Sequence, residues 1–217
     1  IISNSITSIS ASVFQNISVI TSITIGNSVT SIGNNAFDGC SGLTSIILPN
    51  SVTSIGTYAF SGCAELLNIV FTPTVQVQSF EEGLFSDCSK LTSITIPSSV
   101  TTIGDKVFKT SGLISISIPD TVTSFGDEVF RNCSGLTSIT FTSSSTLATM
   151  GSETFYNCSE LTSFSIPKTV TSVGTKTFYN CVKLTNFTFE TTSQLLNISN
   201  EMFYGCNTLP AIVIPNS

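Results

Sequence analysis

The sequence predicts a solenoid, in which one short unit is repeated and each coil stacks on the coil before it. Three observations support this: a recurrent phenylalanine, an alternating apolar segment with the same period, and a recurrent glycine between them. Successive phenylalanines are separated by 23, 23, 25, 23, 22, 25, 23 and 25 residues. They are Phe14, Phe37, Phe60, Phe85, Phe108, Phe130, Phe155, Phe178 and Phe203.

The alternating segment predicts a strand in every coil. In 91–96, apolar residues at the first, fourth and sixth positions alternate with hydroxyl residues, which is the period of a half-buried strand. Stacking nine copies predicts a parallel sheet about 40 Å long, with ~4.8 Å between strands. The copies begin at Ile20, Leu43, Leu66, Leu91, Leu113, Leu136, Leu161, Leu184 and Leu209. Proline follows five copies and ends the strand, because it cannot donate to the ladder: Pro49, Pro97, Pro119, Pro167 and Pro215.

The rest of each coil predicts a second strand and a turn. Short apolar segments such as 52–55 indicate a brief second strand on the opposite side. The stretch from the glycine through the phenylalanine predicts a single helical turn, too short to be stable alone. The phenylalanines then form an internal spine, each worth about 1.5–3 kcal/mol on burial. The glycines are expected at a position of positive φ: Gly33, Gly56, Gly104, Gly126, Gly151 and Gly174.

The three longer coils share a second feature. Where the step is 25 residues, the sixth position of the strand is phenylalanine and no proline follows it. We interpret the two extra residues as a local widening that the larger ring fills, since protein interiors are close-packed. These rings are Phe71, Phe141 and Phe189, followed by Thr72, Thr142 and Glu190.

Composition and charge exclude several classes of function. Only 9% of the residues are charged, the net charge is −6, and the seven basic residues are scattered, which argues against nucleic-acid binding. No apolar run approaches the ~20 residues of a membrane helix, so this segment is not expected to insert into a membrane. Histidine is absent, carboxylates are mostly single and no phosphate-binding loop occurs, so we predict a non-enzyme without cofactor.

Seven cysteines lie three residues after the recurrent phenylalanine. An odd number, a gap at Ser111 and side chains that point the same way argue against disulfides, and the absence of histidine and of paired cysteines argues against a metal site. We interpret them as a ladder of buried small apolar residues, a role that suits free cysteine. They are Cys40, Cys63, Cys88, Cys133, Cys158, Cys181 and Cys206.

The repeat unit resembles that of the BspA-like leucine-rich-repeat family over essentially the whole chain. The matching pattern, L-x-S-I-x-I-P-x-x-V-x-S-I-G-x-x-A-F-x-x-C, is seen in 43–49, 52–56, Ala59, Phe60 and Cys63. The resemblance implies a leucine-rich-repeat solenoid of about nine coils. It also implies a surface protein of bacteria or protists that adheres to host matrix proteins or to other cells.

The outward sheet positions are the candidate binding surface. Of 27 such positions, 18 are Ser or Thr, two are Asn and none is charged. Apolar outward residues therefore stand out as a possible contact patch for protein partners. The candidate residues are Ile47, Leu67, Val70 and Ile114, with Thr92 and Thr95 between them.

Three alternative functions can be proposed for this surface. The first is the protein-binding module of a cell-surface adhesin, and the alternative is an intracellular scaffold with the same fold. Regular threonine rows raise ice or glycan binding as a third class, although the outward positions hold no aromatic platform. Five Asn-x-Ser/Thr sequons are compatible with a secretory route: Asn16, Asn132, Asn157, Asn186 and Asn197.

Residues 1–217 are expected to form one solenoid domain. Solenoids need polar caps at their ends, and none is visible here, so we predict a fragment of a longer array. A signal sequence and an anchor would then lie outside this segment. Uncapped ends could also stack copies into oligomers.

Overall fold

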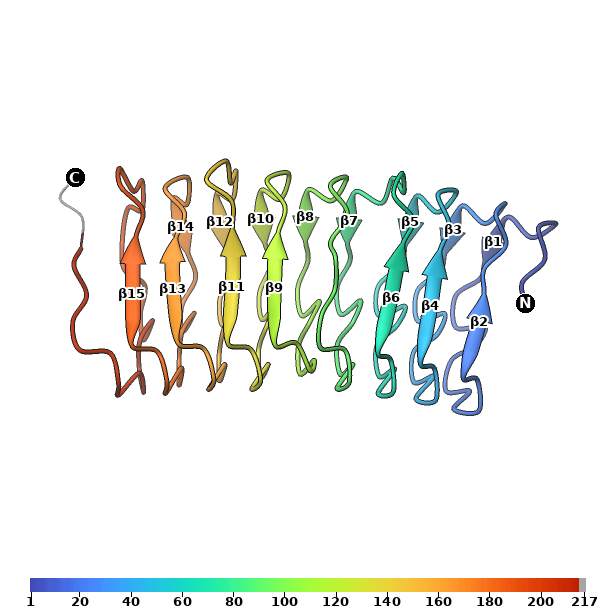
Figure 1. Cartoon of the computed structure of the whole chain (residues 1–217), viewed down its shortest axis with the longest axis horizontal. Helices are drawn as coiled ribbons and strands as arrows, with labels where there is room; N and C mark the ends of the chain where they lie inside the picture. Colours follow the sequence, from blue (N-terminus) through green and yellow to red (C-terminus); the bar gives the residue numbers. More distant parts are fainter. Residues whose placement is uncertain (215–217) are drawn as a thin grey trace.

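The computed structural model describes residues 1–214, which wind into a parallel β-solenoid (Figure 1). The predicted fold class is confirmed, with about eight turns in place of nine coils. The count is lower because nine equivalent residues bound only eight complete turns, and because the ninth predicted strand, 209–214, is not paired as a strand. Pro215, predicted to end it, lies outside the described residues.

The front wall carries the predicted strands, and they are parallel (Figure 1). Buried and exposed residues alternate along them, as in β4, where Ile46 and Leu48 point into the core. Equivalent residues of neighbouring coils are paired, for example Ile46 with Ile69. The strands are β2 (Ser22–Thr24), β4 (Ser45–Leu48), β6 (Asn68–Phe71), β9 (Ser115–Ile118), β11 (Ser138–Phe141), β13 (Ser163–Ile166) and β15 (Asn186–Phe189).

The front wall is not the single ribbon that we predicted. It divides into the sheets β2-β4-β6, β9-β11 and β13-β15, and the segment 91–96 between the first two is not paired as a strand. Each sheet ends at a strand that closes with Phe71, Phe141 or Phe189. These rings are only partly buried and pack against the core. The end of each sheet therefore coincides with a 25-residue coil, which a strand-by-strand reading cannot anticipate.

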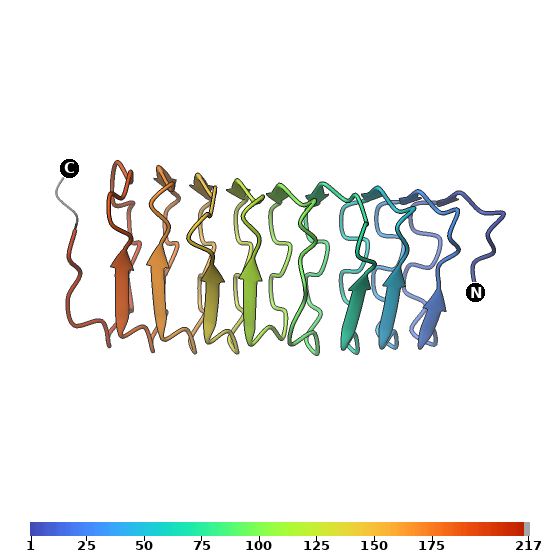
Figure 2. The ribbon, with the colours of Figure 1, turned by 45° about the horizontal axis from the view of Figure 1, so that its top comes forward.

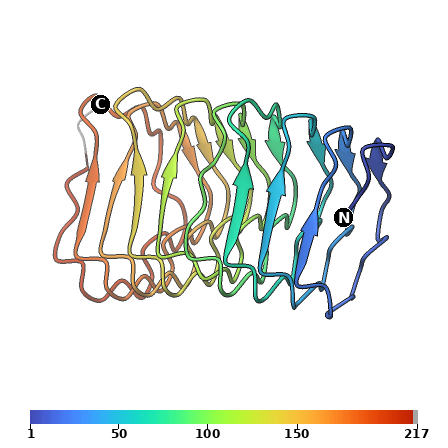
Figure 3. The same ribbon diagram turned by 45° about the vertical axis from the view of Figure 1, so that its right-hand side comes forward.

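The second row of strands is confirmed on another wall (Figures 2 and 3). Its members are two residues long and each buries its second residue. They form the sheets β1-β3-β5 and β7-β8-β10-β12-β14. Their bounds are β1 (Ser8–Ile9), β3 (Ser31–Ile32), β5 (Ser54–Ile55), β7 (Ser79–Phe80), β8 (Thr102–Ile103), β10 (Ser124–Phe125), β12 (Thr149–Met150) and β14 (Ser172–Val173).

The predicted helical turn around each phenylalanine is wrong, and no helix forms in residues 1–214. The residues two before and two after each spine phenylalanine have left-handed φ, as in Glu128 (57°) and Asn132 (61°) around Phe130. A right-handed helix cannot continue through such residues. Instead, Glu128, Phe130 and Asn132 each donate a backbone N–H to a carbonyl of the next coil, at 2.8 Å. The segment is thus a third ladder between coils.

The recurrent glycines are required for a reason other than the one predicted. None of Gly33, Gly56, Gly104, Gly126, Gly151 and Gly174 has positive φ. At Gly174, a Cβ atom would lie 2.3 Å from the backbone nitrogen of Ser152 in the preceding coil. Real Cβ atoms do not approach backbone so closely, so the glycine is needed because two coils touch there.

The phenylalanine spine is confirmed. Phe37 to Phe178 are fully buried, whereas Phe14 and Phe203 at the two ends are partly buried. Consecutive rings stack with centroids 5.2–5.9 Å apart, from Phe14–Phe37 at 5.2 Å to Phe178–Phe203 at 5.8 Å. This offset-stacked arrangement is favourable for aromatic pairs and adds to the burial of their apolar area.

The cysteine ladder is also confirmed, since all seven thiols are free and buried. Each Sγ donates a hydrogen bond to the carbonyl oxygen of the spine phenylalanine in the preceding coil, as Cys133 does to Phe108 at 2.9 Å. The sequence alone did not reveal this bond. The thiols therefore hold neighbouring coils together as well as filling space.

We expect the buried thiols to make the stability fall at alkaline pH. Burial raises the pKa of Cys88 to about 12 and that of Cys133 to about 11, whereas an unfolded thiol ionises near ~8.5. The unfolded state then binds fewer protons than the native state above that value. The stabilisation that comes from keeping these thiols protonated is complete below pH ~8.5. It declines towards pH ~11 by up to ~1.4 kcal/mol per pH unit for each thiol.

The measurement is urea unfolding at several pH values between 7 and 11. A Cys133→Ser variant is the control, because serine does not titrate and already occupies this column at Ser111. Equal slopes for the two proteins would contradict the assignment. Thiol reagents at pH 8 should label none of the six fully buried cysteines, Cys40 to Cys181, until the chain unfolds.

Candidate functional site

The exposed side of the front wall is neutral and rich in hydroxyls. Its threonines are partly committed to the fold: the Oγ1 of Thr44 donates to the carbonyl of Thr21 at 3.0 Å, and that of Thr185 to Thr162 at 3.2 Å. Thr137 bonds Ile114 in the same way. The hydroxyls of these threonines therefore donate to the preceding coil and are not free to donate to a ligand. This weakens the hypothesis that rows of free threonine hydroxyls bind ice or glycans.

Three of the predicted apolar residues lie on two neighbouring coils, and we call them the apolar patch. Ile47 on β4 and Val70 on β6 are paired across the ladder, and Leu67 directly precedes β6. Ile47 is 59% exposed, Leu67 57% and Val70 39%. Ile47 and Val70 are therefore direct neighbours, and Leu67 lies three residues before Val70 on the same coil, on a surface that holds mostly Ser and Thr elsewhere.

The other three predicted residues are exposed but lie outside the apolar patch. Thr92 and Thr95 belong to the unpaired segment 91–96, and Ile114 comes one coil later. The N–H of Ile114 donates to the carbonyl of Thr92 at 3.0 Å, so Thr92 separates Ile114 from Leu67. Ile114 is therefore an isolated exposed residue, which is common on protein surfaces.

A groove lies beside the apolar patch, where the front wall divides. It has a volume of about 310 Å³ and runs between β6 and the segment 91–96. We call it the break groove; Asn68, Ile69, Val70, Phe71, Ser93, Ile94 and Thr95 line it. Within residues 1–214, no backbone hydrogen bond joins 92–96 to β6. Sequence reasoning missed this groove, although the 25-residue step marked its place.

A second groove occupies the equivalent place after another 25-residue coil. It has a volume of about 430 Å³ and lies between β15 and the segment 211–213. Asn186, Phe187, Thr188 and Phe189 line it as Asn68 to Phe71 line the break groove. Both grooves therefore lie beside a strand that ends a sheet and closes with a phenylalanine.

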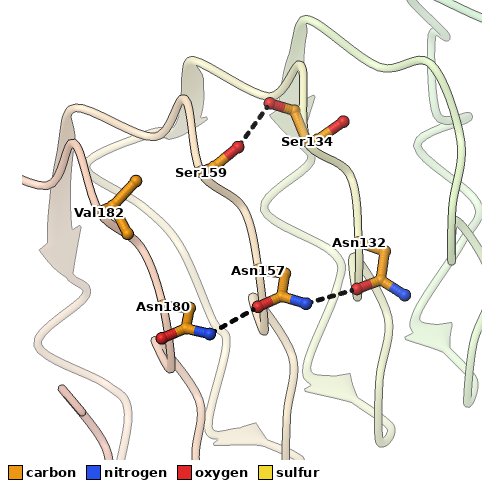
Figure 4. Close-up of a pocket in the computed structure, with 6 residues that line it drawn as sticks. All are labelled: Asn132, Ser134, Asn157, Ser159, Asn180 and Val182. Carbon is orange, nitrogen blue, oxygen red and sulfur yellow. Dashed lines mark hydrogen bonds between the residues drawn. The ribbon is translucent and has the colours of Figure 1, made fainter. Parts of the chain in front are cut away.

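A third hollow, of about 500 Å³, lies on the turns that follow the spine (Figure 4). Asn157 Nδ2 donates to Asn132 Oδ1 at 3.0 Å, and Asn180 Nδ2 donates to Asn157 Oδ1 at 3.1 Å. All three asparagines have left-handed φ, a conformation that asparagine tolerates. We call this site the amide hollow; its lining is Asn132, Ser134, Asn157, Ser159, Asn180 and Val182.

The outward positions of the front strands carry no charge, and most charged side chains pair with one another across coils. Lys90 pairs with Glu65 at 2.6 Å, Lys106 with Glu82 at 2.9 Å, and Arg131 with Glu153. In the described part of the chain, no three His, Cys, Asp or Glu side chains gather to hold a metal ion. No helix of residues 1–214 is long and apolar enough to span a membrane.

Comparison with known families gives one match that covers the whole chain. The model of the BspA type leucine rich repeat region matches residues 1–114 and 101–217, in six copies. No curated protein matches the chain at a significant level.

Solved structures with the same fold are also found. A leucine rich cell surface protein from Faecalibacterium prausnitzii is 28% identical with a TM-score of 0.55, over 97% of this chain and 71% of that one. A leucine rich repeat protein from T. pallidum is 27% identical with a TM-score of 0.63, over 82% and 72%. A leucine-rich repeat protein from Eubacterium ventriosum is 22% identical with a TM-score of 0.56, over 91% and 67%, and supports the fold alone.

Proposed function

Because this chain belongs to the BspA-type leucine-rich-repeat family, we propose that it is the protein-binding module of a cell-surface adhesin. In this proposal the front wall attaches to proteins of a host matrix or of neighbouring cells. Leucine-rich repeats are typically interaction scaffolds without catalytic chemistry. The F. prausnitzii relative, described as a cell surface protein, supports the location.

One observation carries the choice of surface: the apolar patch and the break groove lie side by side on an uncharged face. Cores of protein interfaces are depleted in charge and are centred on a few apolar anchors. Val70 belongs to both features, so a partner side chain in the groove would also contact the patch. Ile69, Phe71 and Ile94 complete the apolar lining of the groove.

We expect the double substitution Leu67→Asp and Val70→Asp to abolish most of the binding. Two carboxylates at the centre of an apolar contact would lose their hydration without gaining partners. The expected loss is at least about tenfold in affinity, or ~1.4 kcal/mol. The measurement is binding of the purified chain to immobilised fibronectin, laminin and collagen.

The matched control is Ser163→Asp with Ser165→Asp, which places two carboxylates on exposed positions of β13, away from the apolar patch. Both side chains are exposed there, so the thermal unfolding of both variants should stay close to that of the original chain. Retained binding by the patch variant would overturn the surface assignment. Equal loss in both variants would show that charge anywhere on the face is enough.

A further inference from the structure

The amide hollow holds polar groups that the fold does not use. The amide of Asn157 donates one hydrogen to Asn132 and accepts one from Asn180, and we call these bonds the amide ladder. Its second amide hydrogen and the second lone pair of its oxygen have no partner in these bonds. Within residues 1–214, neither Asn132 Nδ2 nor Ser134 Oγ donates a hydrogen bond to protein. The hollow therefore offers donors and acceptors held in fixed positions by the ladder (Figure 4).

The fold does not require asparagine in this column. The equivalent positions of other coils hold glycine at Gly39 and Gly62, an aspartate at Asp87 and a threonine at Thr110, all with left-handed φ. Glycine fits this conformation better than asparagine. Three successive asparagines are thus a local feature of the coils between 130 and 182.

A column of tyrosines accompanies the asparagines on the same turns. Tyr156 stacks on Tyr179, and Tyr179 on Tyr204, with centroids 4.7 Å apart in both pairs. The guanidinium of Arg131 lies 4.2 Å from the ring centre of Tyr156. Tyr204 is 61% exposed, and the equivalent positions in the coils before Tyr156 carry no aromatic residue. Amides, hydroxyls and aromatic rings are therefore concentrated in one part of the solenoid.

The charges near this region cancel one another. Glu160 and Lys183 follow directly after lining residues and pair with each other at 2.7 Å. Arg131 pairs with Glu153 and Glu128. The six lining residues carry no charge, and Val182 is the only apolar one. A charged ligand would find no counter-charge, and an apolar side chain would find little apolar surface.

We propose that the amide hollow binds a neutral oligosaccharide, laid along the solenoid axis across the three asparagine-bearing coils. Sugar hydroxyls are donors and acceptors at once, which matches the free amide and hydroxyl groups of the lining. The recurrence of the amides, once per coil, suits a linear ligand with repeating units. This activity is separate from protein binding by the apolar patch, which lies on the front wall.

The test measures binding of maltohexaose, cellohexaose, xylohexaose and chitohexaose to the whole chain by amide-detected NMR and calorimetry. The decisive variant is Asn157→Gly with Asn180→Gly. It removes two amides but installs the residue that other coils carry in this column. The control is Asn16→Gly, in the same column but outside the hollow.

We expect at least one neutral hexasaccharide to shift resonances within 132–182, and the double variant to weaken that binding by at least about tenfold. Asn16→Gly, and the Leu67→Asp/Val70→Asp variant of the apolar patch, should leave it unchanged. The proposal is overturned if none of the four sugars binds at 10 mM. It is also overturned if the double variant binds as well as the original chain, or if a hyaluronan hexasaccharide, which is anionic, binds equally tightly.

Discussion

Replacing Phe130 by alanine is expected to lower the free energy of unfolding by about 3–5 kcal/mol. The ring is fully buried and stacks between Phe108 at 5.4 Å and Phe155 at 5.2 Å, with Phe125 against it edge-on at 5.9 Å. Its removal leaves a cavity that backbone on both sides cannot close, because the ladders fix the spacing between coils. Urea unfolding followed by circular dichroism measures the loss.

Phe14→Ala provides the comparison. This ring belongs to the same column but is only partly buried and stacks on Phe37 alone, at 5.2 Å. We expect it to lose less than half as much stability as Phe130→Ala, because less apolar area returns to water. Similar losses at both positions would mean that the spine does not act as a continuous buried column.

The second large effect is expected at Gly174, where even alanine should destabilise the chain by about 1–3 kcal/mol or more. The three atoms nearest to the added Cβ belong to the backbone of Gly151 and Ser152, at 2.3–2.5 Å. Backbone cannot turn aside as a flexible side chain does, so the two coils must move apart. The hydrogen bond from Gly174 N–H to Met150 O, 2.8 Å long, would be strained as well.

Gly135→Ala is the matched control. There the added Cβ would meet only the carbonyl oxygen of Leu113, at an ordinary contact distance of 3.7 Å, and φ is not positive. We expect this variant to be neutral or to gain ~0.4–1 kcal/mol, because alanine restricts the unfolded chain. Thermal unfolding of the two variants distinguishes close approach from a general cost of losing glycine, which would lower both melting temperatures.

Much of the architecture could be predicted because equivalent residues of successive coils have equivalent surroundings. An inward residue such as Ile46 has the same neighbours in every coil, so a period of two within the strand and of 22–25 between strands is enough to place it. The same reasoning placed Phe108 and Cys133 in the core and Leu67 and Val70 on the surface. The chemistry of these columns is visible in the residue types themselves.

The candidate site was predicted only in part. Sequence reasoning found the apolar patch, because an aliphatic residue among serines and threonines is conspicuous. It also placed Ile114 further along the sheet with Thr92 in the coil between, and the hydrogen bond from the Ile114 N–H to the Thr92 carbonyl agrees with that order. It missed the break groove and the amide ladder, because both depend on which atoms of neighbouring coils meet.

The sequence by itself determined the period, the two rows of strands, the direction of each side chain and the buried columns of Phe and Cys, since these depend on local alternation and hydrophobicity. Only the tertiary structure decided where the front sheet divides and why Gly174 must be glycine. It also decided that residues as different as Glu128 and Asn132 share a left-handed backbone. The physical reason is that these features are set by hydrogen bonds and contacts between coils, which position backbone regardless of the side chain it carries.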